Sequence, residues 1–495
     1  MAADGTRTVS ERPAQGAPDR SVTGLPDRMR AWLVALALVA LALVTLVWLR
    51  FLWGALHAPV GQYDFSTYYA AALALRANPH ADIYSQAVIA QAGAAAHTQV
   101  QPPLPYTYPP LFAYLLIPFT FLSFHIAARA WMAVNVAIWL VCGALLVSEL
   151  HRSLAPRIAA APSGTVASAS PPAAGPGAWW ARLVANPVSL VAVALAAALC
   201  LPFGPAQQTL LLGQINFLVL LPLALVPGFT WTRHERWVGV AIACAAMLKL
   251  TPGVLLLYLA LRRRWEALIA AVVALLALAL LSIVLIGPST FFAIIPQALQ
   301  VGAGDATLGH NEALFAPAFA ALSGALPGFA ALAHPVTYAL LALLAVAIGW
   351  VLWHAPRPVA GSAYPLSADL PAYAVALCAV VLLSPTAWVH HYVWLLPAAA
   401  LALVTLGDVW AAPAGPDRGR AARLALLAVV GCVLLALTLP FEWDTQPNPS
   451  VTLLFGLPLR WLALEARPIG ALLVLLVTAR LALHPRSETP APKAS

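Results

Sequence analysis

Long apolar runs separated by short polar stretches make up most of the chain between residues 31 and 484. A helix needs about 20 apolar residues to cross the hydrocarbon layer of a membrane. Strands of a membrane barrel would alternate apolar and polar residues, whereas these runs are continuous. The pattern therefore predicts an all-α polytopic membrane protein with about 10 to 13 transmembrane helices.

The apolar runs differ in length, and some are too short or too interrupted to span a membrane. They lie at 31–56, 109–124, 127–149, 183–203, 209–229, 237–260, 266–287, 313–333, 335–354, 371–387, 388–407, 422–440, 451–464 and 468–484. The first run is longer than the apolar core of a secretory signal, which has about 7–15 residues. We therefore expect it to be an uncleaved helix that leads out of the cytoplasm.

The run at 237–260 has two possible topologies, because basic residues stand at both of its ends. Basic clusters favour the cytoplasmic side of a membrane. A single crossing would expose one cluster on the outside. A re-entrant hairpin that turns near Lys249 and Pro252 would keep both clusters inside, provided that protein or water satisfies the freed backbone groups.

The chain divides into one membrane domain with polar tails and two long polar interruptions. We expect a disordered cytoplasmic tail at 1–28, a transmembrane domain at 29–484 and a disordered C-terminal tail at 485–495. We expect the stretch 57–108 to form a structured first extracytoplasmic loop, with helical patterns near 65–77 and 84–97. The stretch 151–178 is rich in Ala, Pro, Ser and Gly, a composition typical of a flexible linker.

Composition supports the membrane prediction, because 62% of the residues are hydrophobic and only 9% are charged. Soluble domains carry about 25% charged residues. The formal net charge is +8, but the basic residues form short clusters between apolar runs rather than one patch. That distribution marks cytoplasmic loops and argues against a nucleic-acid partner. The five cysteines are scattered singly, so neither a zinc site nor a redox pair is indicated.

Two charged residues stand where the surrounding sequence is poor in charge. Lys249 lies inside an apolar run, where a charge costs about 2.5 to 3.5 kcal/mol and commonly lines a substrate path. Snorkelling to an interface or pairing with a carboxylate is the structural alternative. Asp64 follows the first helix among uncharged residues, where it could cap a helix or act as a tuned acid or base. Tyr68 lies one helical turn further on and could share its face.

Other polar residues could reach a substrate from the outer ends of predicted helices. His390 and His391 are adjacent, so they diverge by about 100 degrees on a helix and are not expected to chelate one metal together. Gln214 and Asn216 open a predicted helix, where they could bind substrate or join neighbouring helices. His310 lies in a predicted outer loop and is a weaker candidate.

Taken together, these motifs resemble glycosyltransferase family 87, also known as DUF2029, of the GT-C superfamily. The match is carried by their order along the chain: DFSTYYAAALAL with IYS after it (64–85), YTYPPLFAYLLIPF (106–119), GQINF (213–217), the LKLTP–RRRW unit (248–265) and SPTAWVHHY (384–392). The resemblance implies a GT-C-like bundle and a membrane enzyme. Such an enzyme would transfer a hexose, with mannose expected, from a polyprenyl-phosphate donor to a lipid or glycolipid acceptor.

The resemblance also implies roles for individual residues. Asp64 matches the family's catalytic aspartate and would be the general base of an inverting transfer. Lys249, His390 and His391 would bind the donor phosphate, while Tyr68, Gln214, Asn216 and His310 would bind substrate. No DxD motif follows Asp64, so a metal-independent reaction without a cofactor is expected, with the lipid-linked sugar as co-substrate.

The expected location is the cell (inner) membrane, crossed many times, with the active site on the extracytoplasmic side. The main alternative is a secondary transporter or lipid flippase, which would also carry charges within the membrane. Transporters commonly consist of two repeated halves, and the 57–108 loop has no counterpart later in this chain.

Overall fold

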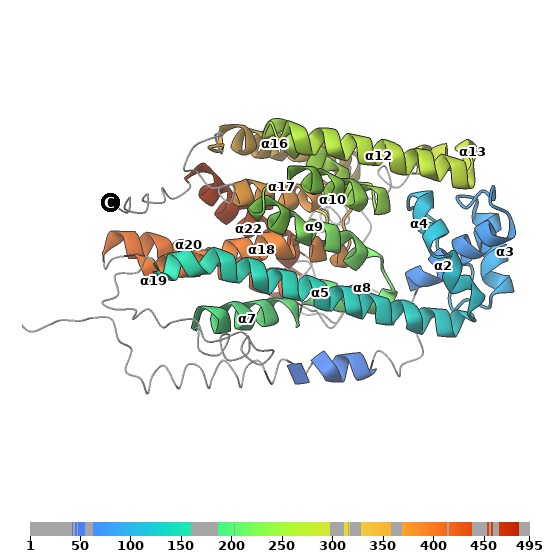
Figure 1. The fold of residues 1–495 in the computed structure, drawn as a ribbon, viewed down its shortest axis with the longest axis horizontal. Helices are drawn as coiled ribbons and strands as arrows, with labels where there is room; N and C mark the ends of the chain where they lie inside the picture. The colour runs from blue at the N-terminus through green and yellow to red at the C-terminus, as the bar shows by residue number, and fades with distance from the viewer. Residues whose placement is uncertain are drawn as a thin grey trace, which may run out of the picture.

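The computed structural model shows a bundle in which most of the long helices run roughly side by side, with a smaller helical cluster at one end (Figure 1). The structure describes residues 63–159, 187–201, 203–297, 311–314, 316, 328–357, 369–412, 415–437, 453–454, 457–458 and 465–484, together with 42, 45–46 and 48–54. The prediction of an all-α polytopic membrane protein is confirmed. A single ladder of two-residue strands, β1 (Leu453–Leu454) and β2 (Leu457–Pro458), is the exception within these ranges.

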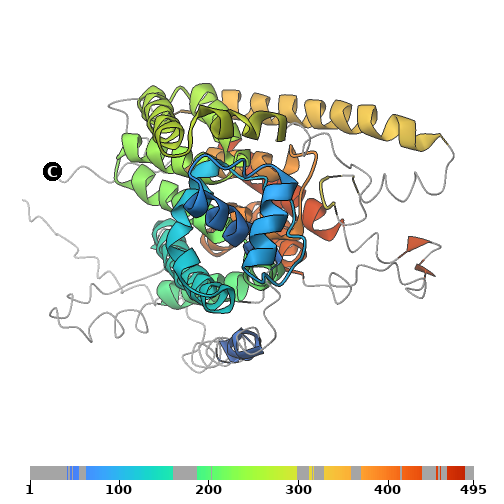
Figure 2. The same ribbon diagram turned by 90° about the vertical axis from the view of Figure 1, so that its right-hand side faces the viewer.

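The end cluster is built from the sequence between the first apolar run and residue 121. It contains α2 (Tyr63–Ala77), α3 (Gln86–Ala95), α4 (Pro110–Leu115) and the 3₁₀ helix η1 (Ile117–Phe121). Figure 2 shows these helices from the end, in front of the bundle. The helical patterns expected near 65–77 and 84–97 are confirmed by α2 and α3. The run at 109–124 is divided between α4 and η1 and forms no span.

Within the described residues, six helical segments are long and apolar enough to cross a membrane. They belong to α5 (Phe124–Ala159), α12 (Trp265–Ile286), α16 (Phe329–His354), the consecutive η4 (Val389–Leu395), α18 (Leu396–Leu403) and α19 (Thr405–Ala411), α20 (Pro416–Ala436) and α22 (Ala466–Leu483). The short α13 (Pro288–Phe292) follows α12. The protein is thus a multi-pass membrane protein.

Shorter apolar helices complete the bundle. The helices α7 (Pro187–Cys200) and α8 (Gly204–Leu212) meet at a bend of 51° and could form a seventh, broken span. The helices α9 (Asn216–Trp231) and α17 (Leu370–Leu382) are apolar but shorter. Because the first run lies largely outside the described residues, the expected total of about 10 to 13 crossings stays a prediction. Helix α5 continues through Ala159, so it includes the first residues of the segment interpreted as a linker.

The run at 237–260 forms a hairpin rather than one straight helix. Helix α10 (Glu235–Leu248) ends at Lys249, and the chain continues through η2 (Thr251–Val254) and α11 (Leu255–Leu261). Two ion pairs connect the start of α10 with the start of α12: Glu235 with Arg264 at 2.6 Å, and Arg236 with Glu266 at 2.8 Å. Both basic clusters therefore lie at the same end of the bundle. Of the two topologies considered, the re-entrant hairpin fits, with Lys249 at its tip.

Close backbone contact holds this hairpin against α12. A Cβ atom at Gly239 would lie 1.9 Å from the carbonyl oxygen of Ala267, so no larger residue fits there without displacing a helix. At the base of the hairpin, the buried Arg262 pairs with Asp369 at 2.6 Å, and Tyr258 donates a hydrogen bond to the same carboxylate at 2.8 Å. The base of the hairpin is thus fixed by ion pairs, and its tip is directed into the bundle.

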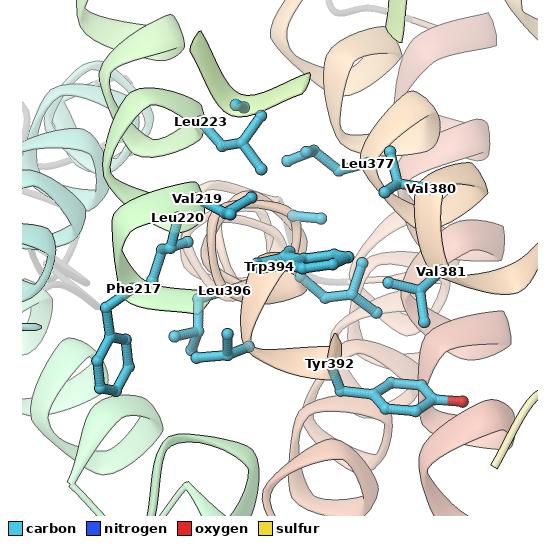
Figure 3. Packing of buried hydrophobic residues seen from close by; sticks show 14 of the residues in the cluster. Phe217, Val219, Leu220, Leu223, Leu377, Val380, Val381, Tyr392, Trp394 and Leu396 are labelled. Carbon is cyan, nitrogen blue, oxygen red and sulfur yellow. The ribbon is translucent and has the colours of Figure 1, made fainter. Parts of the chain in front are cut away.

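The core lies around the helical segment that follows the two histidines. The candidate span Val389–Val409 is the most buried of the six, because 89% of its apolar stretch lies inside the bundle. Trp394, on η4, occupies the centre of this core (Figure 3). Figure 3 also shows core residues of α9 and α17 around it: Phe217, Val219, Leu220, Leu223, Leu377, Val380 and Val381. The η4 segment is therefore a central packing element that also carries polar side chains.

Candidate active site

The turn between α8 and α9 forms the centre of the candidate site. Gly213 ends α8 in the left-handed conformation (φ 69°), which glycine adopts without steric cost. The backbone N–H of Gln214 then donates to the Thr209 carbonyl, and α9 begins at Asn216. Trp131 of α5 donates its indole N–H to the Gly213 carbonyl at 2.7 Å. The GQIN sequence is thus held rigidly, with Gln214 and Asn216 pointing to different partners.

Gln214 joins the turn to the end cluster. Its side-chain oxygen accepts hydrogen bonds from the hydroxyls of Tyr68 at 3.0 Å and Tyr108 at 3.1 Å. Gln214 also lies near the carboxyl of Asp64, and hydrogen bonding from its side chain lowers the pKa of that group. Both tyrosines and Gln214 are buried, and the Tyr68 and Tyr108 rings meet edge to face at 4.9 Å. The structure therefore brings Asp64, Tyr68 and Gln214 together, as a shared helix face predicts for the first two.

Asp64 lies in the first turn of α2, which is not one of the candidate spans, and its side chain is partly accessible. Burial raises the pKa of this carboxyl to about 6, while the hydrogen bond from Gln214 and the positive charge of Lys249 lower it. Desolvation is the largest of these effects, so the pKa of Asp64 rises overall. A carboxyl with such a pKa is mostly ionised near neutral pH, yet basic enough to accept a proton.

Lys249 reaches the site from the tip of the hairpin. Its ammonium group donates to the Asn216 side-chain oxygen at 3.3 Å and lies 2.7 Å from Nε2 of His391. It also lies over the rings of Tyr108 (5.4 Å) and Trp394 (5.0 Å). Snorkelling would instead direct the amine to the surface. Lys249 is therefore held inside the bundle by aromatic and hydrogen-bonding neighbours.

Three buried side-chain nitrogens near Lys249 have no hydrogen-bond partner among the described residues: Nδ2 of Asn216, Nδ1 of His390 and Nε1 of Trp394. Leaving a buried polar group unpaired costs about 1–3 kcal/mol, so one such atom calls for an explanation and a group of them indicates a function. Nitrogens of this kind can donate to the oxygen atoms of a bound ligand. Together with the Lys249 ammonium they suit an anionic or polyhydroxylated molecule.

A short loop holds the histidine-bearing segment in place. The Asn311 side-chain oxygen accepts from the backbone amides of Ala313 and Ala387, both at 2.9 Å, and its nitrogen donates to the Pro385 carbonyl at 3.1 Å. Next to it, the carboxylate of Glu312 forms a buried ion pair with Arg467 of α22 at 2.7 Å. The loop thus connects the start of η4 to the last described helix.

Most of the site residues expected from the sequence meet at this position. Asp64, Tyr68, Gln214, Asn216, Lys249, His390 and His391 all contribute to it. His310 lies outside the described residues, so its role stays a prediction. Two residues were missed, Tyr108 and Trp394. Tyr108 belongs to the YTYPP motif, whose spacing gave no reason to select it, and Trp394 resembles an ordinary core residue.

No group of three or more His, Cys, Asp or Glu side chains that could hold a metal ion occurs in the described parts of the chain. The prediction of a metal-independent reaction without a cofactor nevertheless stays untested. The residues that surround Asp64 are instead hydroxyl, amide and ammonium groups. Such groups bind anions and sugar hydroxyls.

Comparisons with known proteins place the chain among membrane enzymes. It is 30% identical over 415 residues to a polyprenol-phosphate-mannose-dependent alpha-(1-2)-phosphatidylinositol mannoside mannosyltransferase of Mycobacterium tuberculosis, covering 81% of this chain and 84% of that protein. It is also 30% identical over 315 residues to a mannosyltransferase of the same description from Mycolicibacterium smegmatis, covering 62% and 63%. No solved structure matches the chain.

The sequence profile of glycosyltransferase family 87 matches residues 106–385, which is more than half of the chain. Asp64, His390 and His391 lie outside this range, whereas Gln214, Asn216 and Lys249 lie within it. The match favours the prediction of an enzyme over that of a secondary transporter or lipid flippase. The chain is a membrane glycosyltransferase, and it belongs to glycosyltransferase family 87.

Proposed function

We propose that the protein transfers mannose from a polyprenyl-phosphate donor to a phosphatidylinositol mannoside or a closely related glycolipid, at the outer face of the cell membrane. The activity described for the two relatives supports this donor and this class of acceptor. The observation that carries the proposal is the arrangement of Asp64 and Lys249. A carboxylate suited to accept a proton and a partly buried cation both lie next to the same turn.

The reaction that fits this arrangement is a single inverting displacement. The Asp64 carboxylate takes the proton of an acceptor hydroxyl while that oxygen attacks the anomeric carbon of mannose. The bond between the anomeric carbon and the phosphate oxygen breaks, and its electron pair leaves with the polyprenyl phosphate. Asp64 is then protonated, and it returns its proton to solvent through its partly accessible edge.

The leaving phosphate gains negative charge as the bond breaks, so it needs cationic or hydrogen-bonding partners. The Lys249 ammonium supplies the positive charge, and Asn216, His390 and Trp394 offer the unpaired nitrogens next to it. These groups are held by packing before the donor arrives, because all three side chains are buried. The burial of the cation makes its attraction for phosphate stronger than it would be in water.

Charge distribution supports an active site on the outer side. The hairpin carries arginines at its base and Lys249 at its tip, next to the end cluster of α2 to α4. A further basic group, Arg418, Arg420 and Arg423, begins α20, and the short α19 just before it lies at the end of the bundle away from that cluster (Figure 1). Basic ends favour the cytoplasm, so the end cluster and Asp64 would face outward.

The test uses the full chain in liposomes with radiolabelled polyprenyl-phosphate mannose and a phosphatidylinositol mannoside acceptor. The proposal predicts labelled glycolipid with this donor and none with a nucleotide-linked mannose. Lys249→Met should raise the donor KM at least tenfold, because the cation and its hydrogen-bond role are both lost. Transfer from the nucleotide sugar alone, or an unchanged donor KM in Lys249→Met, would refute the proposed donor site.

A further inference from the structure

The GQIN turn contacts both charged residues of the proposed reaction. Gln214 hydrogen-bonds Asp64, and Asn216 accepts a hydrogen bond from Lys249 at 3.3 Å. The turn itself is anchored from behind by the indole of Trp131 on the Gly213 carbonyl. Asp64 and Lys249 come from segments 185 positions apart (249 − 64), so the short turn between α8 and α9 is their common reference point.

The orientation of the Gln214 amide follows from its hydrogen bonds. Tyr68 and Tyr108 both donate to the side-chain oxygen, which uses both of its lone pairs. The amide nitrogen is then the group of Gln214 that remains for the Asp64 carboxylate, whose pKa hydrogen bonding from Gln214 lowers. The opposite orientation would set two oxygen atoms against each other and leave the nitrogen between two hydroxyls. Two tyrosines therefore direct an N–H group of Gln214 toward Asp64.

We infer that the turn from Gly213 to Asn216 is a positioning element, in which Gln214 orients and holds the base Asp64 while Asn216 holds the cation Lys249. This inference rests on the proposed function, and it assigns Gln214 a different role from the substrate binding expected from the sequence. Its amide has its bonds satisfied within the protein, whereas the Asn216 nitrogen is left for a ligand. The element keeps base and cation at a constant separation.

The pH profile tests Gln214 separately from its structural contribution. The groups that face Asp64 are Gln214, the ammonium of Lys249 and the hydroxyls of Tyr68 and Tyr108. Gln214→Met removes a hydrogen bond to the ionised carboxylate. It should raise the midpoint of the acid limb, the pH at which kcat/KM falls by half on the acid side, by about one to two pH units. Gln214→Glu should shift it at least as far, because a second carboxylate disfavours ionisation. Tyr108→Phe should shift it less, because one tyrosine still directs the amide.

Substitution of Asn216 should change the donor KM rather than the pH profile. Asn216→Leu keeps the side-chain size but loses the bond to Lys249, so it should raise the donor KM severalfold and leave the acid limb in place. Gln207→Met, a similar change on α8 away from the turn, should alter neither quantity. Variants are compared only as monodisperse protein with a wild-type unfolding temperature. Tyr108→Phe, the mildest change, serves where Gln214→Met fails that check.

Two outcomes separate this inference from the proposed function. If Asp64→Asn transfers mannose at the wild-type rate, the proposed base is wrong, and Gln214 has no catalytic base to position. If Asp64→Asn is inactive while Gln214→Met and Tyr108→Phe keep the wild-type acid limb, only the positioning role is overturned. A shift of the limb in Gln214→Met together with an unmoved limb in Asn216→Leu supports it.

Discussion

The pKa of Asp64 gives the sharpest quantitative prediction. A general base must be ionised to accept a proton, and burial raises the pKa of this carboxyl from 3.8 to about 6. Activity that depends on Asp64 should therefore be present above pH 6 and be lost as the pH falls through that value. An aspartate with the ordinary pKa would stay active to below pH 5.

The magnitude follows from the ionised fraction. With a pKa of about 6, the carboxylate is about 91% ionised at pH 7 and about 9% at pH 5, which gives about a tenfold loss of kcat/KM. With the ordinary value of 3.8, the ionised fraction at pH 5 is still about 94%, and the loss is negligible. The two cases therefore differ about tenfold at a pH that most proteins tolerate.

The assay measures initial rates of mannose transfer in liposomes between pH 4.5 and pH 8 (~0.5-unit steps), at constant ionic strength. Samples held at pH 5 and returned to pH 7 must regain full activity, which separates titration from unfolding. A limb of unit slope near pH 6 agrees with the structure. A profile that stays flat down to about pH 4.5 would refute the assignment of Asp64 as a base with a raised pKa.

The remaining predictions concern the framework around the site. Arg467→Met should destabilise the protein by about 3–5 kcal/mol, because it removes one member of the buried ion pair with Glu312; thermal unfolding in detergent measures this, and an unchanged midpoint contradicts it. Gly239→Val should prevent the hairpin from packing on α12, whereas Gly228→Ala, in open space, should be tolerated; yields of monodisperse protein decide. Single cysteines at Arg236 and Arg263 should both label from the same side of the membrane; labelling from opposite sides contradicts the re-entrant topology.

The fold could be predicted from the sequence where the signal is local. Continuous apolar runs gave the helical class, and the short amphipathic patterns gave α2 and α3. The conflict between two basic clusters and one apolar run led to the hairpin as one of two topologies, because charge restricts which ends share a side. The choice between them required Glu235 and Arg264 to be seen in contact.

The site was predictable only in part, because its geometry depends on long-range packing. Asp64 and Lys249 are unusual in their local sequence and were found for that reason. Tyr108 and Trp394 are common residue types in apolar surroundings, and only the fold brings their rings against a lysine. The Glu312–Arg467 pair joins positions 155 residues apart, which no local pattern can reveal.

The role of Gln214 also depends on the fold. A glutamine at the start of a membrane helix can bind substrate, join helices or orient another side chain. Its neighbours in space decide between these roles, and two of them are tyrosines from the end cluster. The direction of an amide group is fixed by its hydrogen-bond partners rather than by its position in the sequence.

The central claim, that the Asp64 carboxylate is the base of the transfer, is tested most directly by the rate of mannose transfer in Asp64→Asn. The amide is nearly the same size but cannot accept the proton, so kcat should fall by about a hundredfold to ten-thousandfold, with donor affinity little changed. Transfer by Asp64→Asn at the wild-type rate would contradict the account.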